Sequence, residues 1–152
     1  MKDIDQKLII LGSGRLKKNL LKQIKDTSQE NKIFIQESVS KNQIDEFYSR
    51  AKMLIISSRR EGGPRVALDA LFRGIKVIST KVGHMPDILD KRYLCNPDSL
   101  DDLGKLLKNS INQISTIDQS SAFEKVRADF TFMKANNSLL SNYTNLLDSD
   151  IG

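Results

Sequence analysis

Two carboxylates that bracket a glycine turn have the clearest potential for chemistry. Glu61 directly precedes Gly62, Gly63 and Pro64, and Asp69 stands eight positions after Glu61. Adjacent glycines weaken an ordered chain unless the backbone needs unusual angles or a close approach. A proline after them suits the first turn of a helix, whose free N–H groups attract anions. We therefore expect a ligand to bind at this turn.

Glu61 suits hydroxyl groups better than phosphate, because a carboxylate accepts charge-assisted hydrogen bonds from a diol. Asp69 should lie about 7 to 8 Å beyond Pro64 at roughly 1.5 Å per helical residue. That distance fits a polar group at each end of a pyrophosphate, with Arg59, Arg60 and Arg65 adding positive charge near the turn. The alternative is that Glu61 is an ordinary loop acid and that Asp69 pairs with Arg65 at i,i+4.

The elements that must position these residues follow an alternating pattern. Apolar runs at 7–11, 32–35, 53–57, 76–80 and 92–95 predict short strands, and amphipathic segments between them predict helices. Strands that are apolar on both faces indicate a parallel sheet covered on both sides. We predict a doubly wound, Rossmann-like α/β fold of about five parallel strands. Ligands bind such folds at the carboxyl ends of the strands, where a second glycine turn, Gly12-Ser13-Gly14, also lies.

Local signals set the expected helix ends. Ser40 to Gln43 has the capping-box pattern, and a helix from about Pro64 to Arg73 should end at Gly74. Asp98 is expected to cap a long leucine-rich helix. The polar tail, about 120–147, is expected to be helical.

Composition places the chain among ordinary globular proteins. At 152 residues it fits a single domain, 1–152, with a core at about 7–115. The net charge of +5 could favour nucleic acid, an acidic membrane surface or a phosphorylated ligand. The lysines are scattered without interleaved aromatics, which favours a solvated basic surface, no nucleic-acid partner and at most peripheral membrane contact. A lone Cys95, expected in the core, and the lack of a signal pattern or a spanning apolar run favour the cytoplasm.

The segment EGGPRVALDALFRGIKVISTKVGHMPDIL closely resembles the donor-binding segment of family-4 retaining glycosyltransferases with the GT-B fold. In that family a glutamate, a Gly-x-Pro turn and a second glutamate eight residues later precede the pattern A-x-x-x-G-x-P-V-I-x-T-x-x-G-G-x-P-E. The upstream order of strand, Gly-x-Gly turn and KIFIQESVSKNQIDEFYSRAKMLIISS also fits. The resemblance covers residues 7 to 115 and implies the C-terminal, donor-binding half of such an enzyme.

The resemblance also implies roles for single residues. Glu61 would be catalytic, contacting hydroxyls of the transferred sugar and stabilising its oxocarbenium charge, and Asp69 would hold the ribose diol. The loop at 36–39 would pass the base. The donor would be a UDP- or GDP-sugar, with no cofactor and no metal. The implied donor-binding residues are Gly12, Gly14, Glu61, Gly62, Gly63, Pro64, Arg65 and Asp69.

The sequence departs from the family pattern at three positions. Asp69 is one methylene shorter than the usual glutamate, His84 replaces the second glycine of the Gly-Gly pair, and Asp87 replaces a glutamate. His84 could crowd the diphosphate or donate a proton to it, although a loop histidine without a partner is more often incidental.

Relative to the family, the acceptor-binding domain and the first strand and helix of the donor domain have no counterpart in the sequence. Gly14-Arg15-Leu16 resembles the missing Gly-Arg motif, but it lies too close to Glu61 and no Lys-Gly follows. We expect the isolated chain to turn over little and to need an acceptor domain, which another chain could supply. The alternatives are a non-catalytic sugar-nucleotide-binding subunit and a truncated relic. Self-association is also expected, together with direct pairing of the strands at 7–11 and 53–57 in a single sheet.

Overall fold

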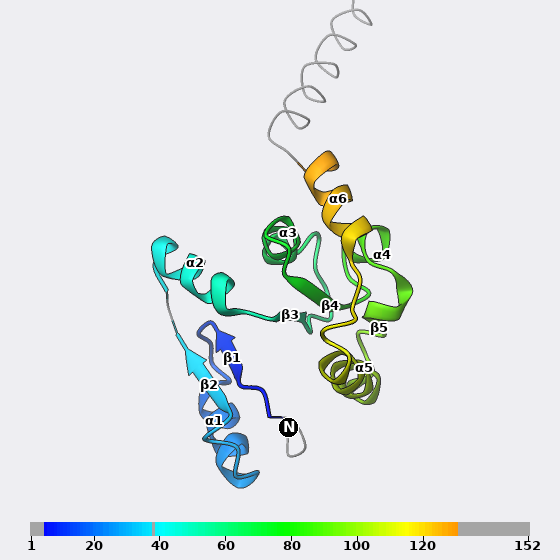
Figure 1. Cartoon of the computed structure of the whole chain (residues 1–152). Helices are drawn as coiled ribbons and strands as arrows, with labels where there is room; N and C mark the ends of the chain where they lie inside the picture. The colour runs from blue at the N-terminus through cyan, green and yellow to red at the C-terminus, as the bar shows by residue number, and fades with distance from the viewer. Residues whose placement is uncertain (1–4, 38, 131–152) are drawn as a thin grey trace, which may run out of the picture. The chain divides into compact units, whose positions relative to one another are not determined.

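The computed structural model describes residues 5–37 and 39–130, which belong to two compact units divided between Arg50 and Ala51 (Figure 1). Unit 1 is the part of the chain up to Arg50, and unit 2 is the part from Ala51 onward. Unit 1 holds β1 (Leu8–Leu11), α1 (Lys17–Asp26), β2 (Ile33–Gln36) and α2 (Lys41–Arg50). Unit 2 holds β3 (Met53–Ile56), α3 (Arg65–Phe72), β4 (Lys76–Thr80), α4 (Met85–Ile88), a 3-10 turn (Lys91–Tyr93), β5 (Leu94–Cys95), α5 (Leu100–Asn112) and α6 (Ser120–Asp129).

Unit 1 is a β-α-β-α segment with one parallel strand pair. β1 lies beside β2 with Leu8 opposite Ile33 and Leu11 opposite Gln36. The predicted capping box at the start of α2 is confirmed. The Ser40 N–H donates to Gln43 Oε1 at 2.8 Å, and the Gln43 N–H donates to Ser40 Oγ at 3.3 Å.

Unit 2 is built around β4, the central strand of a parallel sheet ordered β3-β4-β5. The helices α3 and α5 flank this sheet on opposite sides (Figure 1), and α6 packs against α3 and α4. The fully buried side chains come mainly from α3, β4 and the start of α4: Ala67, Ala70, Leu71, Val77, Ile78 and Met85. Cys95 is buried as expected, and burial raises the pKa of its thiol.

The ends of the helices in unit 2 test two sequence signals. Gly74 ends α3 as predicted: it has φ +76, its N–H donates to Leu71 O, and the next N–H, of Ile75, donates to Ala70 O. The expected Asp98 cap of α5 is wrong. Ser99 is the N-cap, and its Oγ accepts from the Asp102 N–H at 3.1 Å. The short serine hydroxyl reaches the third helical N–H from that position, whereas Asp98 stands one residue too early.

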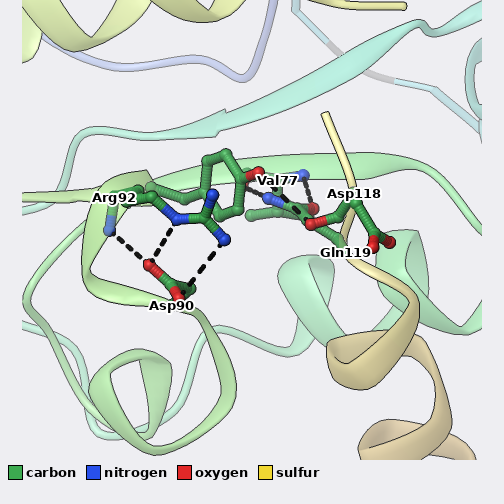
Figure 2. A network of polar contacts seen from close by, with 6 residues as sticks. Val77, Asp90, Arg92, Asp118 and Gln119 are labelled. Atoms are coloured by element: carbon green, nitrogen blue, oxygen red, sulfur yellow. Dashed lines mark hydrogen bonds and ion pairs between the residues drawn. The ribbon is translucent and has the colours of Figure 1, made fainter. Parts of the chain in front are cut away.

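A buried glutamine completes one edge of β4 (Figure 2). Gln119 is 3% exposed; its Oε1 accepts from the Val77 N–H at 2.8 Å and its Nε2 donates to Val77 O at 2.7 Å. The β5 strand pairs only with Ser79 and Thr80, so it does not reach Val77. The glutamine amide therefore supplies the two hydrogen bonds that a longer β5 would have made.

A polar cluster lies next to the Gln119 clamp, which is the pair of hydrogen bonds between the Gln119 amide and Val77 (Figure 2). Arg92 pairs with Asp90 at 3.0 Å, and the hydrogen bonds that it donates hold the pKa of the Asp90 carboxyl below its usual value. The Asp118 carbonyl accepts from the Tyr93 hydroxyl at 3.2 Å, which ties the segment before α6 to the 3-10 turn. This cluster therefore joins the turn before β5 to the segment before α6.

The predicted α/β fold with parallel strands is confirmed. The described strands form two ladders, β1-β2 in unit 1 and β3-β4-β5 in unit 2. The expected pairing of Leu8–Leu11 with Met53–Ile56 would join the two units and stays a prediction. Strands that follow one another in the chain pair preferentially, and every ladder here joins such strands. The expected helical tail begins with α6, and its remainder, 131–147, lies outside the described residues.

Candidate functional site

The turn between β3 and α3 carries most of the predicted site residues. Pro64 is the N-cap residue of α3, buried and with extended backbone, and Arg65 is the first helical residue. Glu61, Gly62 and Gly63 precede it, with Glu61 exposed. The sequence folds this way because the proline ends the loop and the apolar residues Ala67, Ala70 and Leu71 bury the inner face of α3.

The Glu61 carboxylate is oriented by a short chain of hydrogen bonds. Ser58 Oγ donates to Glu61 Oε1 at 2.7 Å. The Ser58 carbonyl accepts in turn from Thr80 Oγ1 at 2.6 Å, and Thr80 is a buried residue at the carboxyl end of β4. Within the described residues the second oxygen, Oε2, accepts no hydrogen bond. One carboxylate oxygen is thus fixed by the fold, and the other is free to accept a ligand hydroxyl.

The glycine turn packs against the loop that follows β4. A Cβ on Gly83 would lie 2.6 Å from Gly62 O and 2.8 Å from its carbonyl carbon, and Gly83 has φ +49. A Cβ on Gly63 would lie 3.0 Å from His84 Cδ2. Gly62, by contrast, has nothing within 4 Å of its Cβ position. The turn is therefore fixed on one side by Gly83 and His84 and open on the other.

Asp69 lies on the exposed face of α3. Among the described residues it forms no ion pair with Arg65 and no side-chain hydrogen bond. The alternative reading, in which Asp69 only pairs with Arg65, therefore finds no support in the structure. Its carboxylate is available to a ligand.

Gly12 and Gly14 lie in the loop between β1 and α1 of unit 1. The Gly12 N–H donates to Gln36 O at 2.9 Å, and the Gly14 carbonyl accepts from the Lys17 N–H at 3.1 Å. Lys17 Nζ also pairs with Glu37 Oε1 at 2.7 Å, just after β2. Both glycines thus follow the carboxyl end of β1, as predicted, and their meeting with the residues of unit 2 in one donor cleft stays a prediction.

Three contributors to the turn were missed by the sequence reasoning: Ser58, Thr80 and Gly83. Their roles depend on contacts between separate loops, which spacing along one segment does not reveal. Of these three residues, Gly83 had a signal in the sequence that could have identified it, because it directly precedes His84, where the sequence departs from the family pattern.

The family model described as "Glycosyl transferases group 1" matches residues 1–119 of the chain. This chain belongs to that family. A similar curated protein is the N-acetyl-alpha-D-glucosaminyl L-malate synthase of Bacillus anthracis, which is 25% identical over 96 residues. That alignment covers 61% of this chain and 25% of the relative.

Several solved structures share the fold. HepE from Anabaena in complex with UDP superposes with a TM-score of 0.80 at 17% identity, covering 92% of this chain and 41% of that one. Sucrose-phosphate synthase from Thermosynechococcus elongatus gives 0.79 at 16% identity, covering 94% and 39%. The C-terminal domain of a group 1 glycosyl transferase from Francisella tularensis gives 0.73 at 22% identity, covering 84% and 71%. The chain thus spans about a quarter of its curated relative and about two fifths of the first two of these structures.

The described residues offer neither a metal site nor a membrane-spanning helix. They contain no group of three or more His, Cys, Asp or Glu side chains placed to hold a metal ion. None of the described helices is both long and apolar enough to cross a membrane.

Proposed function

We propose that the chain is the donor-binding part of a retaining glycosyltransferase that moves a sugar from a nucleoside diphosphate to a glycan or glycolipid acceptor. The observation that carries this proposal is the family match over residues 1–119, which spans both glycine turns. The fold shared with HepE, whose structures hold UDP and UDP-glucose, supports a sugar-nucleotide donor, for which we propose a UDP- or GDP-sugar. We expect the protein to work in the cytoplasm, with membrane contact only at the periphery.

The reaction breaks the bond between the anomeric carbon of the sugar and a diphosphate oxygen. Positive charge develops on the sugar and negative charge on the leaving diphosphate. Glu61, with one oxygen held by Ser58, accepts hydrogen bonds from the sugar hydroxyls and stabilises the positive charge. The free N–H groups at the start of α3, with Arg65, stabilise the diphosphate. Asp69 accepts hydrogen bonds from the ribose diol.

The acceptor side of the reaction is expected to lie outside residues 1–152, because the chain spans about two fifths of HepE. The same coverage favours a second candidate, a non-catalytic sugar-nucleotide-binding subunit that works with a separate acceptor-domain chain. In both cases the isolated chain binds the donor and transfers little sugar. A transfer assay with and without an acceptor domain supplied on a second polypeptide separates the two candidates.

A calorimetric titration with UDP, GDP, ADP and their glucose conjugates tests the donor site. We expect one nucleoside diphosphate to bind with a Kd on the order of 0.1 to 1 mM, because few charged groups grip the phosphates. Saturable binding of one base in preference to the others supports the proposal. Failure of every one of these ligands to bind would contradict it and favour a relic.

Two substitutions divide the site into a nucleotide part and a sugar part. Asp69→Ala should weaken the bare diphosphate and the sugar nucleotide alike, by about 10-fold, because a hydrogen bond to a charged group is lost. Glu61→Ala should weaken the sugar nucleotide by a similar factor and leave the bare diphosphate nearly unchanged. Glu30→Ala, an exposed carboxylate just before β2, is the matched control and should change neither. Equal losses for both ligands in both site variants would refute the division of roles.

A further inference from the structure

We propose that the imidazole of His84 donates a hydrogen bond to the diphosphate of the bound donor, an inference that rests on the proposed function. His84 is the chain's one histidine and stands in the loop between β4 and α4. The family pattern has a glycine at this position, so the side chain is a feature of this particular sequence.

The imidazole lies against the glycine turn. The point where a Cβ of Gly63 would stand is 3.0 Å from His84 Cδ2 and 3.5 Å from His84 Nε2. Gly63 immediately precedes Pro64, the N-cap residue of α3. A ring nitrogen of His84 is therefore beside the turn where the first N–H groups of α3 are expected to meet the phosphates.

The residues on either side of His84 fix its backbone. Gly83 packs against the Gly62 carbonyl, and Met85 is fully buried. The Phe130 ring lies beside the imidazole, with centroids 6.3 Å apart and planes tilted by 54°. The loop thus holds the imidazole at the turn, while the residue as a whole remains exposed.

The imidazole has hydrogen-bonding capacity that the described residues do not use. His84 is the N-cap residue of α4, but within the described part of the chain its side chain makes no capping hydrogen bond, no other hydrogen bond and no ion pair. Every imidazole carries at least one N–H, and a diphosphate oxygen is a strong acceptor. If the ring served only to pack against Phe130, loss of its N–H would leave donor binding unchanged. If the ring donates to the diphosphate, loss of the N–H would weaken donor binding.

Because the chain has one histidine, its imidazole can be followed directly by NMR in the full-length, tag-free protein. We expect UDP and inorganic pyrophosphate to shift the imidazole nitrogen signals in a saturable manner, and uridine to leave them in place. The Kd from this shift should match the calorimetric value for UDP. Imidazole signals that stay fixed while UDP saturates the protein would overturn the inference and leave the proposed function intact.

Substitutions separate hydrogen bonding from packing. His84→Phe keeps a ring against Gly63 and Phe130 but removes the N–H, and it should weaken UDP by about 10-fold. His84→Gln restores a side-chain N–H and should bind UDP within about threefold of the unsubstituted chain. Wild-type affinity in His84→Phe would refute the hydrogen bond. If the unsubstituted chain binds none of UDP, GDP and ADP, the proposed function fails and this inference fails with it. If Asp69→Ala weakens UDP binding and His84→Phe does not, only this inference fails.

Discussion

The two glycine turns follow strands of the same kind but are held in different ways. In unit 1, neither Gly12 nor Gly14 has an atom within 4 Å of its Cβ position. Gly12 is required there by its backbone, since its φ is +145. In unit 2, the turn of Gly62 and Gly63 is held by packing, because Gly83 and His84 lie against it.

The difference shows that two similar glycine motifs can need glycine for different physical reasons, a backbone angle in unit 1 and close packing in unit 2. A turn fixed by packing should respond strongly to an atom added at the packed contact, and the response should spread to the residues that contact it. A turn fixed by backbone angle alone should respond only at the residue with that angle. The substitutions below test this distinction in order of decreasing expected effect.

Gly83→Ala should have the largest effect. The new Cβ would meet the Gly62 carbonyl at 2.6 Å, and φ +49 disfavours alanine. We expect the free energy of unfolding of unit 2 to fall by about 2 to 4 kcal/mol and donor binding to be lost with it. Urea unfolding followed by circular dichroism measures the change. Gly104→Ala, with open space on α5, is the control and should stabilise the protein by about 0.5 to 1 kcal/mol. Equal responses at both positions would show that packing does not hold this turn.

Thr80→Val should have an intermediate effect on the same turn. It removes the hydroxyl that donates to Ser58 O at 2.6 Å while keeping the size of the side chain. We expect a loss of about 1 to 2 kcal/mol in stability, because the bond is buried. Sugar-nucleotide affinity should fall as well, since Ser58 orients Glu61. Thr80→Ser keeps the hydroxyl and should retain that affinity in the same titration; a loss as large as that of Thr80→Val would show that the hydroxyl alone does not maintain the site.

Gly12→Ala and Gly14→Ala should have the smallest effects on stability, and they test unit 1. The first should cost about 1 kcal/mol through backbone strain alone, without a clash. The second should stay within about 0.5 kcal/mol, because its backbone angle is ordinary and its surroundings are open. Thermal unfolding of both variants measures the difference. A large effect at Gly14 would mean that packing also holds the turn of unit 1.

Features set by neighbouring residues were predictable from the sequence. The Ser40–Gln43 capping box and the Gly74 helix end need only a few consecutive residues, and the structure has both. The cap of α5 shows the limit of such signals, because Asp98 and Ser99 are adjacent and either type can cap a helix. The local signals therefore placed the start of α5 to within one residue, but they assigned the N-cap to Asp98 instead of Ser99.

Features that depend on distant segments were not predictable in the same way. The expected pairing of Leu8–Leu11 with Met53–Ile56 joins strands of different units and stays a prediction, whereas each ladder within a unit pairs strands that follow one another in the chain. In the candidate site, the sequence pointed to Glu61, Gly63 and Asp69 but not to the Thr80 hydroxyl or the close approach of Gly83. These contacts join loops about 20 residues apart, and no spacing rule within one element predicts them.

The glutamine clamp on Val77 has a consequence for the solubility of the protein. An open stretch of strand edge offers its N–H and carbonyl groups to any extended peptide, including one from another molecule. Gln119 occupies both groups of Val77 with one carboxamide and is itself buried, so a foreign strand that approached β4 at that point would find no free partner. The segment before α6 thereby prevents a strand of another molecule from pairing with β4 at Val77.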